Sequence, residues 1–114
     1  MSPTGPPVPL FRLEGQYWGF VADNGVYDRY GRHIGWVEGV NVFDRSGRFM
    51  GELRFSQYVL RDLLRTEPIH RAPRDAVPYP VPPTPPPDRA VRAPIADWRD
   101  ALPWPLTPPL PPRV

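Results

Sequence analysis

The fold is decided by the stretch Val26-Tyr27-Asp28-Arg29-Tyr30-Gly31-Arg32-His33-Ile34-Gly35, because its pattern recurs every sixteen residues. The copies span residues 10–19, 26–35 and 42–51, and each opens with an aliphatic residue followed by an aromatic one. A glycine stands four residues after the aromatic residue, and a second glycine stands four residues further on. A fourth copy begins at Tyr58-Val59 and then loses the pattern, with Leu60 at the turn position and Leu63 in place of the glycine. A repeat of fixed period indicates one supersecondary unit that is used several times.

Each copy predicts a β-hairpin. Residues 28–31 and 44–47 read Asp-x-x-Gly, which is typical of a type I turn that ends in a left-handed glycine. The return strands expected at 17–21, 33–37 and 49–53 are apolar on both faces, so the sheet must be covered twice or curl on itself. We therefore predict an all-β fold, a small antiparallel hairpin repeat of about seven short strands that forms a closed or nearly closed meander.

The prolines predict how the chain is divided. Twenty prolines occur, and none of them lies between Leu10 and Glu67. Because proline fixes φ and lacks an N–H donor, this distribution predicts three segments. They are a disordered arm over residues 1–9, a β-hairpin domain over 10–65 and a disordered proline-rich tail over 66–114. Two stretches stay ambiguous: residues 58–65 as strand or helix, and residues 94–102 as a short helix with Ile95, Trp98 and Leu102 on one face.

Composition excludes several classes of protein. The 114 residues contain no cysteine, so no disulfide framework and no cysteine metal site are expected, and we predict no cofactor. All fourteen basic residues are arginine and the formal net charge is +2, a weak balance that argues against a dedicated nucleic-acid binder. No apolar run approaches the length of a membrane span, and the chain starts without a signal-peptide pattern, so a cytoplasmic protein is expected.

No catalytic constellation emerges from the titratable residues, and the protein is not expected to be an enzyme. His33 stands where the other copies have Tyr17 and Phe49, so it is expected to be a packing ring, and His70 lies in the proline-rich tail. Four arginines recur beside the turns and form an alternative site for a lipid head group or another small anion. They are Arg29, Arg32, Arg45 and Arg48.

The tail carries the signals for a protein partner. Residues 82–87 and 108–112 should populate polyproline II, and residues 108–113 fit the P-x-x-P-x-R pattern read by Src-homology-3-type grooves. Tryptophans in a segment without a core suggest docking, either on a partner or back onto the β domain. The predicted partner-binding residues are Ile95, Trp98, Leu102, Trp104, Pro108, Pro111 and Arg113. The function expected is therefore that of an adaptor or scaffold that acts through its proline-rich tail, with a membrane surface as a weaker candidate partner.

The segment 31–38, which reads Gly-x-His-x-Gly-Trp-x-Glu, together with residues 42–48, resembles the bacterial four-fold β-flower family. The resemblance covers residues 10 to about 61. It implies successive hairpin petals about a pseudo-four-fold axis, often followed by a proline- and arginine-rich tail, and it implies no established biochemical activity. Because the fourth copy is incomplete, the last petal could be closed by this chain or by a second one, and the oligomeric state stays open.

Overall fold

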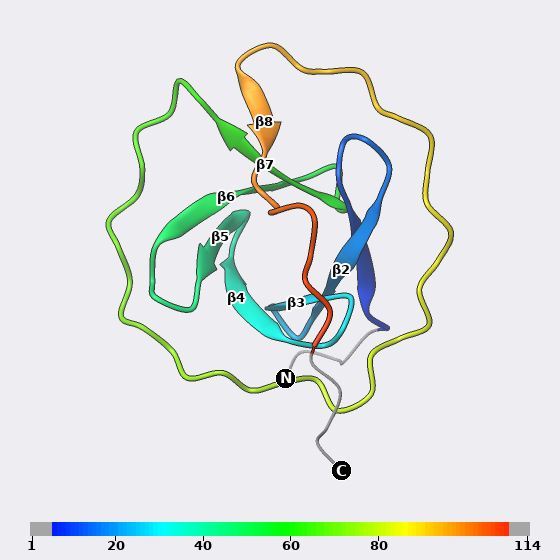
Figure 1. Ribbon diagram of the computed structural model, residues 1–114. Coiled ribbons are helices and arrows are strands. Elements are labelled where there is room, and N and C mark those ends of the chain that lie inside the picture. Colours follow the sequence, from blue (N-terminus) through cyan, green and yellow to red (C-terminus); the bar gives the residue numbers. More distant parts are fainter. Residues whose placement is uncertain (1–5, 110–114) are drawn as a thin grey trace.

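The computed structural model describes residues 6–109, which form one antiparallel sheet of eight strands in chain order (Figure 1). The strands are β1 (Val8–Phe11), β2 (Tyr17–Ala22), β3 (Gly25–Asp28), β4 (His33–Glu38), β5 (Asn41–Asp44), β6 (Phe49–Arg54), β7 (Tyr58–Asp62) and β8 (Trp98–Asp100). Each strand pairs with its neighbours in the chain, so the sheet is a meander without a crossover. The all-β prediction is confirmed, with one strand more than the expected seven.

Consecutive strands form four antiparallel pairs, which we call petals: petal 1 is β1–β2, petal 2 is β3–β4, petal 3 is β5–β6 and petal 4 is β7–β8. The predicted turns close petals 2 and 3, where Gly31 and Gly47 have φ angles of +85° and +90°. The buried carboxylate of Asp28 accepts the N–H groups of the third and fifth turn residues, and Asp44 does the same in its own turn. These bonds explain why aspartate opens the repeat in both turns.

The links between petals also make tight turns, but the third differs in length. Asp23 and Asn24 both adopt positive φ, as a two-residue type I′ turn requires. The third link holds three residues, 55–57, since Arg54 pairs with Tyr58. This extra residue shifts the repeat, so Val59 rather than Tyr58 takes the core position of the fourth copy. The prediction that Leu60 stands at the turn is therefore wrong: Leu60 lies within strand β7, and the turn begins at Asp62.

Petal 4 is completed by the same chain, but only after a long excursion. β7 pairs with β8, in the register Leu60↔Asp100 and Asp62↔Trp98. The helix predicted over residues 94–102 is therefore wrong, because the unpaired edge of β7 offers backbone hydrogen bonds that so short a helix cannot match in stability. Residues 58–62 are strand, which settles the first ambiguous stretch.

The core lies on the pseudo-symmetry axis and takes one aliphatic residue from each petal. Leu10, Val26, Val42 and Val59 are each 0% exposed and pack with Trp18. Leu102, which follows β8, joins the same cluster and is 2% exposed. In Figure 1 the chain after β8 crosses the centre of the flower, which places this tail residue in the core.

Residues 63–97, which we call the strap, run around the outside of all four petals (Figure 1). Three backbone N–H groups of the strap, those of Arg71, Tyr79 and Arg89, donate to the carbonyl oxygens of Gly47, Gly31 and Gly15 at 2.8–2.9 Å. A Cβ added to these glycines would lie 1.8, 2.8 and 2.0 Å from the carbonyl oxygens of the same strap residues. The turn glycines are thus needed twice, for their positive φ and for the close approach of the strap.

The strap contains no strand and no helix, in keeping with its prolines. The expected boundary at residue 65 nevertheless does not divide an ordered domain from a free arm, because several strap residues and Thr107 are hydrogen-bonded to the flower and β8 belongs to the sheet. The N-terminal boundary also moves, since β1 begins at Val8 and contains Pro9. β1 is an edge strand of the sheet, where proline is tolerated.

Candidate interaction surface

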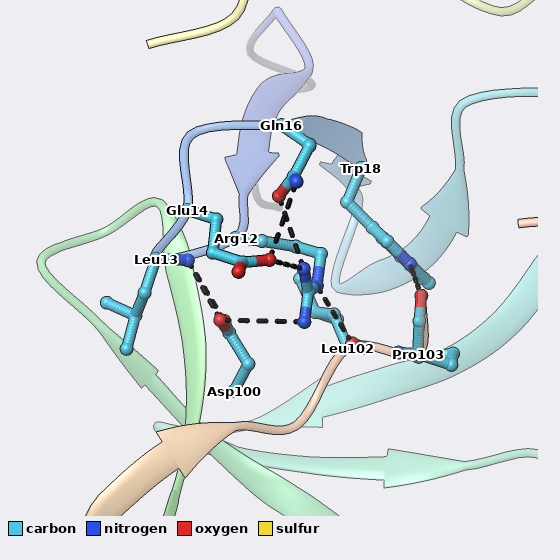
Figure 2. A network of polar contacts seen from close by, with 8 residues as sticks. All are labelled: Arg12, Leu13, Glu14, Gln16, Trp18, Asp100, Leu102 and Pro103. Carbon is cyan, nitrogen blue, oxygen red and sulfur yellow. Dashed lines mark hydrogen bonds and ion pairs between the residues drawn. The ribbon is translucent and has the colours of Figure 1, made fainter. Parts of the chain in front are cut away.

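Petals 1 and 4 are joined by a polar network around Arg12 and Asp100 (Figure 2). The Asp100 carboxylate accepts the backbone N–H of Leu13 at 2.9 Å, and the Arg12 guanidinium lies 3.9 Å from it. Arg12 also donates to the carbonyl oxygen of Leu102 at 3.4 Å, and the indole N–H of Trp18 donates to that of Pro103 at 3.0 Å. Arg12 occupies the position that Asp28 and Asp44 hold in petals 2 and 3. By its contacts with Asp100 and Leu102, this arginine fixes β8 and the residues after it.

The carboxyl groups of this network, and that of Glu38 elsewhere in the flower, differ in the direction of their pKa shifts. Burial raises the pKa of Asp100 above its usual value, although the hydrogen bond from Leu13 opposes the shift. The neighbouring Glu14 behaves in the opposite way, because the hydrogen bond from Arg12 lowers its pKa. At the tip of β4, the hydrogen bond from the Trp36 indole lowers the pKa of Glu38. Of these three carboxyl groups, Asp100 is the one whose surroundings disfavour the charged form.

Five strap arginines lie over aromatic rings of the flower, and four of them lie within 5 Å of the ring centroid. The guanidinium carbon of Arg74 is 3.9 Å from the ring centroid of Trp36, and that of Arg71 is 4.7 Å from that of Phe43. Arg89 lies over Phe11 and Arg92 over Phe55, at 4.0 and 4.1 Å. Sequence reasoning missed these contacts. Their signal is a pair of Arg-Ala-x-Arg segments, 71–74 and 89–92, whose first residues donate to petal glycines in the same way.

In petal 2 the strap uses a tyrosine in place of arginine. The Tyr79 ring packs edge-on against Phe20 and Tyr27, with centroids 5.0 and 5.3 Å apart. His33 stacks on Tyr27 at 5.1 Å, so it is a packing ring as predicted. It also anchors the strap, since its Nδ1 atom accepts the N–H of Val77 at 3.0 Å while Nε2 contacts the carbonyl oxygen of Gly35. This arrangement is that of a neutral imidazole with its proton on Nε2.

The predicted partner-binding residues divide into three groups. Leu102 is buried in the core, and Ile95 and Trp98 pack half-buried against a cluster that contains Leu60. Trp104 remains 39% exposed, with the Arg12 guanidinium 5.7 Å from its ring centroid, and Pro108 is exposed. Pro111 and Arg113 lie outside the described residues. Trp98 therefore docks back onto the β domain of its own chain.

The four turn arginines are split between the tips of petals 2 and 3. Arg32 pairs with Asp28 at 2.6 Å and donates to the carbonyl oxygen of Thr107, and Arg29 lies over the Tyr17 ring at 5.7 Å. Arg45 donates to the carbonyl oxygen of His33 at 2.9 Å. The fourth, Arg48, is exposed. Most of these side chains therefore already have a role within the fold.

Among the hollows on the described part of the flower, three are lined by residues of the petals and the strap or tail. One of about 210 Å³ lies between strap prolines 83 and 86 and the rings of Tyr17 and Phe20. A second, of about 320 Å³, is lined by Arg54, Phe55, Leu60, Ile95 and Trp98. The third, of about 520 Å³, opens beside Arg12 and Arg99. Within residues 6–109 no group of three histidine, aspartate or glutamate side chains is placed to hold a metal ion, and no helix is long and apolar enough to cross a membrane.

The comparisons with known proteins agree with this architecture. The profile of the family described as 4-fold beta flower protein matches residues 8–104, which takes in all eight strands and the strap. The chain therefore belongs to the 4-fold beta flower family, and this membership fits a non-catalytic β-repeat module. No curated protein and no solved structure matches the chain.

Proposed function

We propose that this protein is a non-catalytic interaction module that presents proline-rich segments of its tail to a partner protein. One observation carries the proposal: the segment from Val81 to Pro87 is fixed at both ends and open between them. Tyr79 and Arg89 are hydrogen-bonded to petal glycines on either side of it. Between these anchors Val81 is 77% exposed, and Thr84, Pro85 and Pro87 are also exposed.

A fixed polyproline segment is a favourable ligand because its conformational entropy has already been lost on folding and is not lost again on binding. One face of the segment is occupied, since prolines 82, 83 and 86 are half-buried against the flower. The opposite face is free for a groove lined by aromatic side chains. A second ligand of the same kind is the P-x-x-P-x-R segment at 108–113, which begins directly after the anchor at Thr107 and starts with two exposed prolines.

The test is a titration of the full chain, labelled with ¹⁵N, with a purified Src-homology-3 domain. Proline lacks an amide proton, so Val81 and Thr84 report on the strap, and Arg113 reports on the terminal segment. We expect saturable shifts at one of these positions, and loss of those shifts on Thr84→Asp with Pro85→Ala or on Arg113→Ala. Val40→Asp is the matched control, because Val40 is exposed in a petal link away from the strap. Shifts at neither position, or loss of the shifts in the Val40→Asp control, would contradict the proposal.

A second candidate function is binding of an anionic head group at the tip of petal 3. It is favoured by the exposure of Arg45 and Arg48 on one turn. Vesicles that contain phosphatidylserine should then float with the protein, and Arg45→Ala with Arg48→Ala should release it. Unchanged flotation of this double variant would exclude the turn arginines as the binding site.

A further inference from the structure

The junctions between petals are built alike, except for the last one. Where β2 meets β3, Phe20 and Tyr27 pair in register and their rings stack at 5.2 Å. Where β4 meets β5, Trp36 and Phe43 pair in the same way and stack at 5.8 Å. The strap then covers both ring pairs, with Tyr79 on the first pair and with Arg71 and Arg74 on the second.

At the junction of β6 and β7 the equivalent register pair is Glu52 and Leu60, so both rings are missing. The equivalence of Leu60 is supported by the neighbouring glycine, because a Cβ on Gly51 would meet the carbonyl oxygen of Leu60. A Cβ added to Gly35 would likewise meet the carbonyl oxygen of Phe43, so Leu60 corresponds to Phe43. The hollow of about 320 Å³ lies here, with Leu60 in its lining. At this junction an aliphatic side chain and a carboxylate stand at the positions of the two stacked rings.

The lining of this hollow combines rings, aliphatic side chains and a guanidinium group. Phe55 and Trp98 supply the rings, Leu60 and Ile95 the aliphatic surface, and Arg54 the charge. The Arg54 guanidinium lies 4.6 Å from the Trp98 ring centroid, so it stands beside the apolar walls. The volume is close to the lower end of the range of about 300–1,000 Å³ found for ligand pockets, which suits a ligand with a single ring.

The charge around the hollow is positive. The Glu52 carboxylate, 5% exposed, is shared by Arg54 at 2.9 Å and Arg65 at 2.7 Å. Arg92 adds a third guanidinium group above the Phe55 ring, and no carboxylate among residues 6–109 forms an ion pair with it. Two arginines share the Glu52 carboxylate, and Arg54 is the charged residue among those that line the hollow, so an anionic group gains from its guanidinium group.

We propose that the hollow at the junction of petals 3 and 4 binds a small aromatic carboxylate. The ring of the ligand takes the place that the stacked rings occupy at the other two junctions, between Trp98 and Phe55. Its carboxylate meets the guanidinium group of Arg54, which presents a planar fork of N–H donors. This site is separate from the exposed face of the strap, and it does not depend on any protein partner.

Phenylacetate is the probe, and benzyl alcohol is a smaller neutral compound with the same phenyl and methylene groups. Titrating the full ¹⁵N-labelled chain with phenylacetate should shift the Trp98 indole N–H signal with saturation, while that of Trp36 stays in place. The Trp98→Phe variant assigns the signal. Benzyl alcohol should bind about tenfold more weakly, because its neutral hydroxyl group cannot form an ion pair with Arg54.

Two variants separate the site from non-specific binding. Leu60→Phe introduces the ring that the equivalent strands carry and should abolish the saturable shift by filling the hollow. If its spectrum shows that Leu60→Phe does not fold, Ile95→Phe fills the same space from the strap. Arg54→Gln should weaken binding about tenfold, and Arg48→Gln, an exposed arginine beside the opposite end of β6, should leave it unchanged.

Several results would overturn the proposal. A linear shift without saturation, equal shifts of Trp98 and Trp36, or undiminished binding in a folded variant with a filled hollow would each exclude the site. Equal binding of phenylacetate and benzyl alcohol would exclude the anionic ligand class and leave a hollow for an apolar group, such as a side chain of a partner protein.

Discussion

Replacing Gly47 by alanine tests whether the strap is a fixed part of the fold. Gly47 has a φ of +90°, and its added Cβ would lie 1.8 Å from the carbonyl oxygen of Arg71. Ordinary contacts of a Cβ lie beyond 3.4 Å, so the strap must leave petal 3 by more than an ångström. Gly39→Ala is the control, because Gly39 also has a positive φ, +64°, but nothing lies within 4 Å of its added Cβ.

The size of the effect follows from the contacts that hold the strap at petal 3. Two backbone hydrogen bonds, from Arg71 to Gly47 and from Arg74 to Arg45, contribute about 1 kcal/mol each. Two guanidinium–ring contacts contribute about 0.5–1 kcal/mol each. The freed residues regain chain entropy, which offsets part of this loss. We therefore expect Gly47→Ala to lower the free energy of unfolding by about 1–3 kcal/mol more than Gly39→Ala does.

Urea unfolding of the full chain measures this difference, and amide hydrogen exchange locates it. The N–H groups of Arg71 and Arg74 should lose their protection in Gly47→Ala, while that of Arg89 keeps its anchor at petal 1. The reasoning is refuted if the two glycine variants are equally destabilised and the Arg71 amide stays protected. The strap would then not contact the turn at Gly47.

Three further predictions concern the tail and its network. Leu102→Ala should lower the free energy of unfolding by about 2–4 kcal/mol, because Leu102 is buried in the core, whereas Leu64→Ala, at a residue 77% exposed, should change it by less than about 0.5 kcal/mol. A urea titration that finds equal effects would place Leu102 outside the core. Arg12→Asp restores the aspartate of the repeat, yet it should destabilise the protein by about 1–3 kcal/mol, since it removes the donor to Leu102 and sets a carboxylate beside Asp100; a gain in melting temperature would show that turn chemistry outweighs the network. Because burial raises the folded-state pKa of Asp100, its contribution to stability falls as the pH rises through that pKa. The melting temperature of Asp100→Asn minus that of the wild type should therefore increase between about pH 3 and pH 7, and a difference that stays constant or falls would contradict the raised pKa.

The petals could be predicted from the sequence because their determinants are local. Asp28 and Gly31 lie in one turn, and the residues on either side of that turn pair with each other, so sixteen residues contain nearly all the information for one petal. The aliphatic residues that open the copies fall at the core positions for the same reason. The fourth copy was misaligned by one residue, because the extra residue in the link 55–57 carries no glycine to reveal it.

The strap and β8 escaped prediction because their determinants are distant in the chain. β8 pairs with a strand that ends at Asp62, and no periodicity connects residues so far apart. Prolines correctly indicate a segment without strands, but they do not indicate whether its few N–H groups find acceptors. The site at the last junction was also invisible: the period of sixteen aligns Glu52 with Phe20 and Trp36, but only the strand register identifies Leu60 as its partner. The Arg-Ala-x-Arg pair was the one available clue to the strap.

The position of β8 after the strap affects how the protein folds as it is synthesised. Petals 1, 2 and 3 are complete when the ribosome has released residue 54, and each can pair its strands at once through local contacts. β7 then waits for residues 98–100, and until they emerge its edge exposes unpaired backbone groups beside a core that lacks Leu102. A chain that stops before β8 would carry this open edge permanently. The sheet can therefore close only after the strap and β8 have been synthesised. Chains that end before β8 should aggregate more readily than chains that contain it.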